Sequence, residues 1–139
     1  MDKIIIVDKQ DKIIGFEEKE KCHDGYGILH RAFSVFIFND KKELLIQQRS
    51  KFKRLWPLYW SNTCCSHPRF DEEIVNAAEK RIKEEFGFWC LLKDLYKFQY
   101  QARFKDEGSE NEMCSVLIGK LEDAGVISKP DRQGQRVVN

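Results

Sequence analysis

One segment of the chain has the periodicity of an amphipathic helix. Its apolar positions follow the 3.6-residue period, and they are Ile74, Ala77, Ala78, Ile82 and Phe86. We expect Asp71 to cap this helix, Glu72 and Glu73 to lie in its first turn, and Gly87 to end it. Because such a helix is apolar along one face only, it needs a second layer of structure to cover that face.

Most of the other patterned segments have the composition of β-strands, rich in aromatic and β-branched side chains. These segments are residues 4–7, 13–16, 31–38, 44–46, 95–102 and 113–119. The first two flank a polar turn and predict an N-terminal hairpin, and the next two flank the turn at residues 39–42 and predict a second hairpin. We therefore predict an α+β domain in which one helix flanks a mixed sheet.

The composition fits a single domain. A chain of 139 residues that is 42% hydrophobic can bury one core but is too small to divide into two. Lysine and arginine number 24 against 23 acids, so there is no global field to attract nucleic acid. No apolar run approaches the roughly 18 residues that a membrane span needs. Five cysteines without a preceding leader favour a reducing cytoplasm, and the oligomeric state stays open.

All three histidines lie in segments that we expect to converge. His23 and His30 flank a glycine-containing loop, and His67 follows two adjacent cysteines. Glu110 and Glu112 are two residues apart, so on a strand their carboxylates project to one face and repel each other unless a cation lies between them. A lone histidine is more often a core or surface residue, and a lone acidic pair is often a solvated strand end. Together, three imidazoles and two carboxylates predict a site for Zn²⁺, Mn²⁺ or Mg²⁺.

The second candidate for chemistry is Cys65. Most cysteines in a reduced protein are buried structural thiols. Residues 61–63 before Cys65 and residues 66–68 after it form a polar stretch that would be out of place in a core strand. We therefore expect this thiol to face a cavity, where a thiol and a carboxylate together can transfer protons.

Basic residues from separate segments form a third candidate group. They are Lys19, Arg49, Lys53 and Arg81. Charged residues usually mark a solvated face, and Lys53 in particular belongs to a charged run. Arg81 is more informative, because on the predicted helix it lies one turn before Glu85. An arginine beside a carboxylate that can hold Mg²⁺ is suited to binding a diphosphate. The aromatic residues that could wall such a groove are Trp56, Tyr59, Trp60 and Tyr100.

These motifs together resemble the type I isopentenyl-diphosphate isomerases of the Nudix superfamily. The resemblance covers about residues 19–119, and it is carried by residues 29–34 (LHRAFS), 61–68 (SNTCCSHP) and 110–112 (ENE). The Nudix box can be placed on residues 66–88. There Ser66 replaces the first glycine and Lys80-Arg81 replaces the Arg-Glu of the hydrolases, while Glu72, Glu84, Glu85 and Gly87 are retained. This pattern favours isomerase chemistry on a Nudix scaffold.

The resemblance implies a role for each candidate residue. One divalent metal would be bound by His23, His30, His67, Glu110 and Glu112. A Mg²⁺ ion on the substrate diphosphate would be held by Glu85 and the Cys65 carbonyl, and the diphosphate by Lys19, Arg49, Lys53 and Arg81. The catalytic residues would be Cys65, Glu112 and Tyr100.

The implied reaction interconverts isopentenyl diphosphate and dimethylallyl diphosphate by protonation and deprotonation on opposite faces of the alkene. Aromatic walls, for which Trp56, Trp60 and Tyr100 are candidates, would stabilise the carbocation between the two steps and exclude water. Two alternatives stay open at this point. One is a Nudix diphosphohydrolase, and the other is a metal-binding chain with weak or no catalysis.

The C-terminal part of the chain departs from this resemblance. We expect residues 1–120 to form the Nudix-like domain, and we expect the chain to be shortened relative to the family, which continues through a further strand and closing helices. Residues 129–136 contain one proline, one glycine and no apolar residue. Residues 121–139 are therefore predicted to be a polar tail that is poorly ordered or forms an irregular strand.

Overall fold

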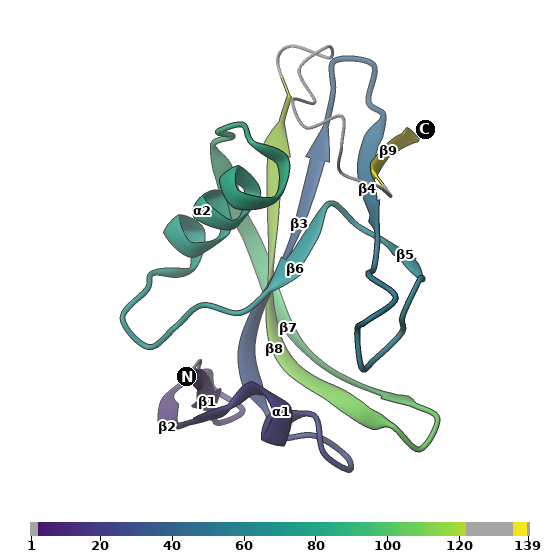
Figure 1. The fold of residues 1–139 in the computed structure, drawn as a ribbon. Helices are drawn as coiled ribbons and strands as arrows, with labels where there is room; N and C mark the ends of the chain where they lie inside the picture. The colour runs from purple at the N-terminus through teal and green to yellow at the C-terminus, as the bar shows by residue number, and fades with distance from the viewer. Residues whose placement is uncertain (1–2, 122–134, 139) are drawn as a thin grey trace.

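The computed structural model describes residues 3–121 and 135–138, in which it has nine strands and two helices (Figure 1). In chain order the elements are β1 (Lys3–Val7), β2 (Ile13–Glu18), α1 (Lys19–Cys22), β3 (His30–Phe38), β4 (Leu44–Gln48), β5 (Trp60–Ser61), β6 (Cys64–Ser66), α2 (Ile74–Phe86), β7 (Leu92–Phe104), β8 (Gly108–Lys120) and β9 (Gln135–Val138). The strands form one mixed sheet, and α2 flanks it. This architecture confirms the predicted α+β class.

Strand β3 is the centre of the sheet. Along one edge it pairs with β8 in parallel register, beginning with His30 beside Glu112. Along its other edge it pairs antiparallel with three partners in succession, β1, β6 and β4. The hairpin partner β7 extends the sheet beyond β8. Because β3 has neighbours along both edges, it brings residues from β6 and β8 together although they are far apart in the sequence.

The two faces of β3 have different surroundings. Phe33, Val35 and Ile37 are at most 1% exposed and belong to a core that also contains the apolar positions of α2. Full burial of such a side chain contributes about 1.5–3 kcal/mol. His30 and Ser34 alternate with these residues and therefore project from the opposite face of the strand. His30 and Ser34 thus lie on the face of β3 that α2 does not cover.

Helix α2 begins two residues later than the sequence indicated. Its N-cap is Glu73, whose carboxylate accepts hydrogen bonds of 3.1 Å from the backbone N–H groups of Val75 and Asn76. The expectation that Asp71 caps the helix was wrong, because the chain still turns at this point: Glu72 bonds back to Arg69 through its side chain and its backbone N–H. The helix ends as expected at Gly87, which has a φ of 84°.

The β7–β8 hairpin is longer than the two strands predicted there. Strand β8 is paired on both edges, with β3 and β7, and its pairing continues back to Gly108. Glu110 and Glu112 therefore lie within a strand and share one face, as expected. The polar sequence at residues 108–112 is typical of a loop in isolation, but its pairing with residues 100–104 of β7 keeps it extended.

The C-terminal residues fall into two parts. Residues 122–134 lie outside the described residues, so their expected poor order stays a prediction. Residues 135–138 form β9, which pairs antiparallel with β4 (Figure 1). None of the helices in the described parts of the chain has the length and apolar character to cross a membrane.

Candidate active site and metal centre

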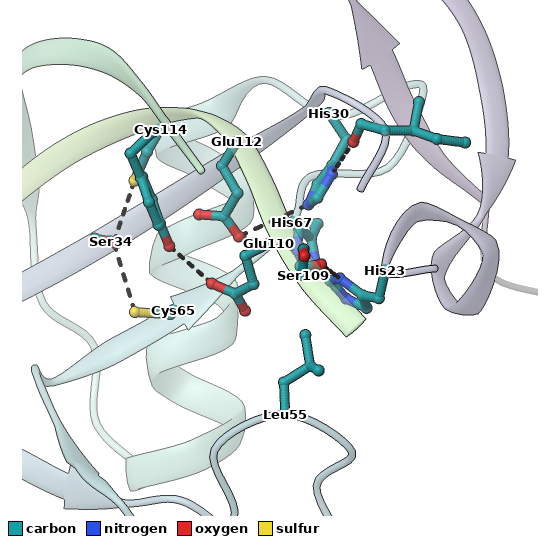
Figure 2. Close-up of polar contacts among 12 residues, drawn as sticks. His23, His30, Ser34, Leu55, Cys65, His67, Ser109, Glu110, Glu112 and Cys114 are labelled. Atoms are coloured by element: carbon teal, nitrogen blue, oxygen red, sulfur yellow. Dashed lines mark hydrogen bonds and ion pairs between the residues drawn. The ribbon is translucent and has the colours of Figure 1, made fainter. Parts of the chain in front are cut away.

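Three structural elements, α1, β3 and β6, bring the three histidines together. His23 is the C-cap of α1, His30 is the first residue of β3, and His67 directly follows β6. The ring centroids of His30 and His67 are 4.9 Å apart, and that of His23 lies 5.6 and 6.1 Å from them. The predicted convergence is therefore present in the structure (Figure 2).

Backbone carbonyls fix the orientation of two of these rings. Nδ1 of His30 is 2.7 Å from the Ile28 carbonyl oxygen, and Nδ1 of His23 is 3.2 Å from that of Ser109. Since a carbonyl can only accept, each Nδ1 carries the hydrogen, and each Nε2 of the neutral ring presents a lone pair. This arrangement, in which one ring nitrogen is anchored, is typical of histidines that bind metals.

The buried nitrogens of His30 and His67 have no hydrogen-bond partner. Both Nε2 atoms are inaccessible to solvent and unpaired, and they lie 3.7 and 3.6 Å from Oε2 of Glu112. These distances are too long for hydrogen bonds. Ligand atoms of these three residues lie within 4.8 Å of one another. A divalent metal would satisfy all three at once, so the residues fit the ion that the resemblance implies.

Two further predicted ligands lie beside this trio without belonging to it. His23 packs against both other rings. The Glu110 carboxylate accepts a hydrogen bond of 2.7 Å from the Tyr100 hydroxyl. The structure therefore joins three of the five predicted ligands directly and places the other two next to them (Figure 2).

The two carboxylates differ in their proton affinity. Burial raises the pKa of Glu110, and the neighbouring Glu112 carboxylate raises it further. Burial also acts to raise the pKa of Glu112, but the His30 and His67 imidazoles outweigh burial and hold that pKa below its usual value. Burial lowers the pKa of His67 to about 4. At neutral pH, His67 therefore offers a neutral imidazole and Glu112 an ionised carboxylate, the forms that bind metals.

The Cys65 thiol is held on the same sheet face by two polar side chains. Its sulfur lies 3.0 Å from Oδ1 of Asn62 and 3.5 Å from Oγ of Ser34, which also approaches Sγ of Cys114 at 3.2 Å. The Asn62 amide is fixed in turn, because its Nδ2 donates to the carbonyls of Val35 and Cys64. Cys65 is exposed, as expected for a cavity residue. Nevertheless, the surrounding protein desolvates the thiol and raises its pKa.

Two adjoining cavities, of about 450 and 510 Å³, surround these residues. The first is lined by His23, His67, Cys65, Glu110 and Glu112, and the second by Asn62, Cys65 and Glu85. Both are lined by three predicted diphosphate-binding residues, Arg49, Lys53 and Arg81, and Lys19 lines the first. Burial and the nearby charges of Lys19, Arg49 and Arg81 lower the pKa of Lys53. All four predicted cations thus converge on the two adjoining cavities.

Two of these cations already have partners. Arg81 forms an ion pair with Glu85 through Nε, and Glu85 also accepts a hydrogen bond of 2.8 Å from Nε2 of Gln47. Arg49 donates through Nε and Nη2 to the carbonyls of Leu55 and Trp56 at 2.9–3.1 Å. Arg49 therefore supports the chain that connects β4 to β5, a contact that the sequence did not predict.

The aromatic residues lie differently from the prediction. Trp56 packs against Phe104, with ring centroids 5.3 Å apart, and neither Trp56 nor Trp60 lines the two cavities. The apolar residues that do line the first cavity include Phe33, Phe52 and Leu55. Sequence reasoning missed Ser34 and Asn62 as the partners of Cys65. Asn62 had one signal, its position in the polar motif around that cysteine, and Ser34 had another, its position at the end of the separate motif at residues 29–34.

Known proteins share both the sequence and the fold of this chain. The NUDIX domain family matches residues 28–136. Isopentenyl-diphosphate Delta-isomerase 1 of Photorhabdus laumondii is 48% identical over 120 residues, which is 85% of this chain and 68% of that protein. Isopentenyl-diphosphate Delta-isomerase of Halorhodospira halophila is 45% identical over 86% of this chain and 69% of that protein. Isopentenyl-diphosphate Delta-isomerase 2 of Photorhabdus laumondii is 39% identical and aligns with the whole chain.

Solved structures of low sequence identity share the fold. The crystal structure of DR0079 from Deinococcus radiodurans matches 99% of this chain and 83% of its own chain, with a TM-score of 0.74 and 14% identity. The MutT protein from Methanosarcina mazei Go1 matches 68% of this chain and 66% of its own, with a TM-score of 0.56 and 18% identity. Sequence and fold agree, and the chain belongs to the NUDIX family and, within it, to the isopentenyl-diphosphate Delta-isomerases.

Proposed function

We propose that this enzyme interconverts isopentenyl diphosphate and dimethylallyl diphosphate. The observation that carries the proposal is the position of the Cys65 thiol and the Glu112 carboxylate. They come from β6 and β8, which border opposite edges of β3, and both line the cavity of about 450 Å³. A double-bond shift that adds one proton and removes another needs two such groups around one apolar substrate.

The proton states of this pair fit the reaction. The pKa of Cys65 is raised by desolvation, so the thiol carries its proton, whereas the pKa of Glu112 is lowered, so its carboxylate is charged. One group can therefore give a proton while the other takes one. Tyr100 is the third proposed catalytic residue. Its hydroxyl donates a hydrogen bond to Glu110 and so orients the Glu110 carboxylate beside Glu112.

We propose one divalent metal, Zn²⁺, Mn²⁺ or Mg²⁺, at His23, His30, His67, Glu110 and Glu112. The unpaired Nε2 atoms of His30 and His67 and the close Glu112 oxygen support this site. When bound, the ion would supply positive charge that stabilises two adjacent carboxylates and polarises any proton held between them. The protein's own part is to hold the imidazoles of His30 and His23 in place through the Ile28 and Ser109 carbonyls.

The diphosphate is proposed to lie among Lys19, Arg49, Lys53 and Arg81, with Mg²⁺ held by Glu85 and the Cys65 carbonyl. The convergence of these four cations on the adjoining cavities supports this placement. Glu85 now pairs with Arg81 and Gln47. Ligand binding therefore exchanges these internal contacts for contacts to Mg²⁺ and phosphate oxygens.

A Nudix diphosphohydrolase is the second candidate function. Its supporting observation is that Glu84 lines the first cavity and Glu85 the second, so two carboxylates of the Nudix box face the proposed diphosphate. Against it stands Arg81, which occupies the position where the box of the hydrolases has a glutamate. A third reading, metal binding without turnover, predicts neither activity.

One experiment distinguishes the three candidate functions. The chain is mixed with isopentenyl diphosphate and Mg²⁺ in D₂O, and both the dimethylallyl product and its deuterium content are measured by NMR. An isomerase gives product that contains solvent deuterium, whereas a hydrolase releases inorganic phosphate or monophosphate. Product without deuterium would contradict proton exchange with Cys65 and Glu112, and an inactive chain with a full metal equivalent would favour the third reading.

We also propose that the enzyme works in a reducing cytoplasm. All five cysteines are free, including the adjacent Cys64 and Cys65. A catalytic thiol has to stay unoxidised to carry a proton.

A further inference from the structure

A single guanidinium ties three segments of the site together. Nε of Arg54 donates to the Glu107 carbonyl at 3.0 Å, Nη1 to the Glu20 carbonyl at 3.0 Å, and Nη2 to the Asp24 carboxylate at 2.8 Å. Arg54 itself lies in the chain between β4 and β5, residues 49–59, which we call the β4–β5 loop. The guanidinium thus connects this loop to the α1 segment and to the β7–β8 turn.

Arg54 contacts the chain on both sides of His23. The Glu20 carbonyl that accepts from Arg54 also accepts the backbone N–H of His23, at 3.2 Å. The Asp24 carboxylate follows His23 directly in the sequence. On the other side, the turn that Arg54 holds leads into Ser109, whose N–H donates to the His23 carbonyl at 2.9 Å and whose carbonyl lies 3.2 Å from Nδ1 of His23.

The β7–β8 turn is packed closely against His23 and Arg54. A Cβ atom at Gly108 would lie 2.3 Å from the His23 carbonyl oxygen and 3.2 Å from Nη2 of Arg54. Of the three histidines, His23 has the weakest attachment to the sheet. His30 lies within β3 and His67 directly follows β6, whereas His23 caps an isolated helical turn of four residues. Its place in the cluster therefore depends on contacts of this kind.

We infer that Arg54 is a positioning residue that holds His23 in the metal cluster and thereby couples the β4–β5 loop to that cluster. The inference rests on the proposed role of His23 as a metal ligand. The β4–β5 loop also carries Lys53, one of the cations that line both cavities. Contacts at the diphosphate side therefore reach the metal side through one side chain.

The shape of the guanidinium matters more than its charge. The ion pairs of Arg54 with Glu20 and Asp24 lie at the surface, where the acidic side chains are 72% and 67% exposed, so they contribute little. The two carbonyl contacts, to Glu20 and Glu107, need donors that point in separate directions from one planar group. A lysine at this position keeps the charge but cannot make both contacts.

The test measures the affinity for Mn²⁺ alone by equilibrium dialysis. Mn²⁺ is the probe because it binds free thiols less strongly than Zn²⁺ does. The proteins are the unaltered chain, Arg54→Ala, Arg54→Lys, His23→Ala and the double variant His23→Ala/Arg54→Ala. The matched control is Arg103→Ala, since Arg103 lies beside the same turn, contacts the Tyr26 ring and the Lys105 carbonyl, and lines neither cavity.

We expect Arg54→Ala and Arg54→Lys each to weaken Mn²⁺ binding by about 10-fold, the lower end for supporting residues of metal sites. The double variant should bind no more weakly than His23→Ala, because Arg54 acts through His23. Additive losses, full rescue by lysine, or an equal loss in Arg103→Ala would each overturn the inference. Asp24→Asn should bind Mn²⁺ normally, because the exposed ion pair with Arg54 contributes little. If Arg54→Ala melts at a much lower temperature, Arg54→Lys, which keeps the charge and most of the side-chain length, keeps the test informative.

Failure of the proposed metal site has a different result. If the unaltered chain binds no Mn²⁺, or if His23→Ala binds as tightly as the unaltered chain, then His23 is not a ligand and the premise of the inference is wrong. If His23→Ala binds weakly but Arg54→Ala and Arg54→Lys bind normally, the metal site stands and the role of Arg54 is refuted.

Discussion

The two sides of the site are built in different ways. On the metal side, His30 and Glu112 are register neighbours on paired strands, and His67 directly follows a third strand. On the diphosphate side, Lys53 and Arg49 lie in the β4–β5 loop, and Arg81 lies on α2. The first group is held by the sheet, whereas the second is supplied by a loop and a helix.

The two sides also differ in what their polar atoms already contact. The metal side leaves two buried imidazole nitrogens without a hydrogen-bond partner, a state that a bound metal ion would relieve. The diphosphate side pairs Arg81 with Glu85 and Arg49 with backbone carbonyls. We therefore expect the metal site to be formed before binding, and the diphosphate site to exchange its contacts on binding.

The largest expected effect tests whether chemistry separates from substrate binding. Cys65→Ala should slow isomerisation by about 10²–10⁴-fold, the usual cost of losing a positioned proton-transfer group. Inorganic diphosphate should still bind, because its proposed contacts are Lys53, Arg81 and the Glu85-held Mg²⁺. Glu112→Gln is expected to have the same outcome. Product formation and diphosphate titration are the two measurements.

The matched control for this prediction is Cys90→Ala, a free and buried cysteine that lines neither cavity. It should leave turnover close to that of the unaltered chain. If Cys65→Ala were fully active, Cys65 would be a structural thiol and the hydrolase reading would regain support.

The second effect concerns the metal side alone. His67→Asn removes one of the two unpaired nitrogens. With one ligand fewer, a bound cation compensates the repulsion between Glu110 and Glu112 less well, so the affinity for Mn²⁺ or Zn²⁺ should fall by about 100-fold or more. Metal content after dialysis is the measurement. Lys53→Gln, on the diphosphate side, should keep a full equivalent of metal while binding diphosphate more weakly.

Two results would contradict this distinction between the metal side and the diphosphate side. Retention of a full metal equivalent in His67→Asn would exclude the histidine cluster as the binding site. Loss of metal in Lys53→Gln would mean that metal binding depends on Lys53 itself, and not only on the contacts that Arg54 makes around His23.

The fold was predictable from the sequence where the patterns are long. The α2 periodicity and the alternation in β3 both reflect burial of one face, and both elements were found. The boundaries were less predictable. Glu73, rather than Asp71, caps α2. Each of the three consecutive acidic residues could act as the N-cap, and the turn that precedes the helix determines which of them does. The extension of β8 back to Gly108 depends on its pairing with β7, which the local sequence of residues 108–112 does not encode.

The site was predictable as a set of residue types but not as a set of contacts. The histidines and glutamates stood out because neutral imidazoles and paired carboxylates together suit a metal. Asn62 and Arg54 did not stand out, because their importance comes from backbone carbonyls that face them only after folding. Trp56 was misplaced for a similar reason: its partner Phe104 lies almost fifty residues away.

A smaller effect tests the diphosphate side. Arg81→Lys keeps the charge but loses the forked donor that pairs with Glu85, so inorganic diphosphate should bind about 10-fold more weakly in the presence of Mg²⁺. Metal content at the histidine cluster should not change. The control is Lys83→Gln on the same helix, since Lys83 bonds to the Gly87 carbonyl and lines neither cavity. Unchanged diphosphate affinity in Arg81→Lys would place the ligand elsewhere.

The smallest expected effect separates the stability of α2 from the integrity of the metal side. Glu73→Ala removes the carboxylate that accepts two backbone N–H groups at the start of the helix, so unfolding should become easier by about 1 kcal/mol. Asp71→Ala removes a carboxylate that lies outside the helix, so it should change the unfolding free energy by much less. Chemical denaturation of both variants is the measurement.

Because α2 packs on the face of β3 opposite to His30, the Glu73→Ala protein should still bind a full equivalent of metal. Its diphosphate affinity should fall slightly, since Arg81 and Glu85 depend on α2 for their position. A Glu73→Ala protein that lost metal in proportion to its loss of stability would show that the sheet alone does not hold His30, His67 and Glu112 in place. The distinction between a sheet-held and a helix-held side of the site would then be wrong.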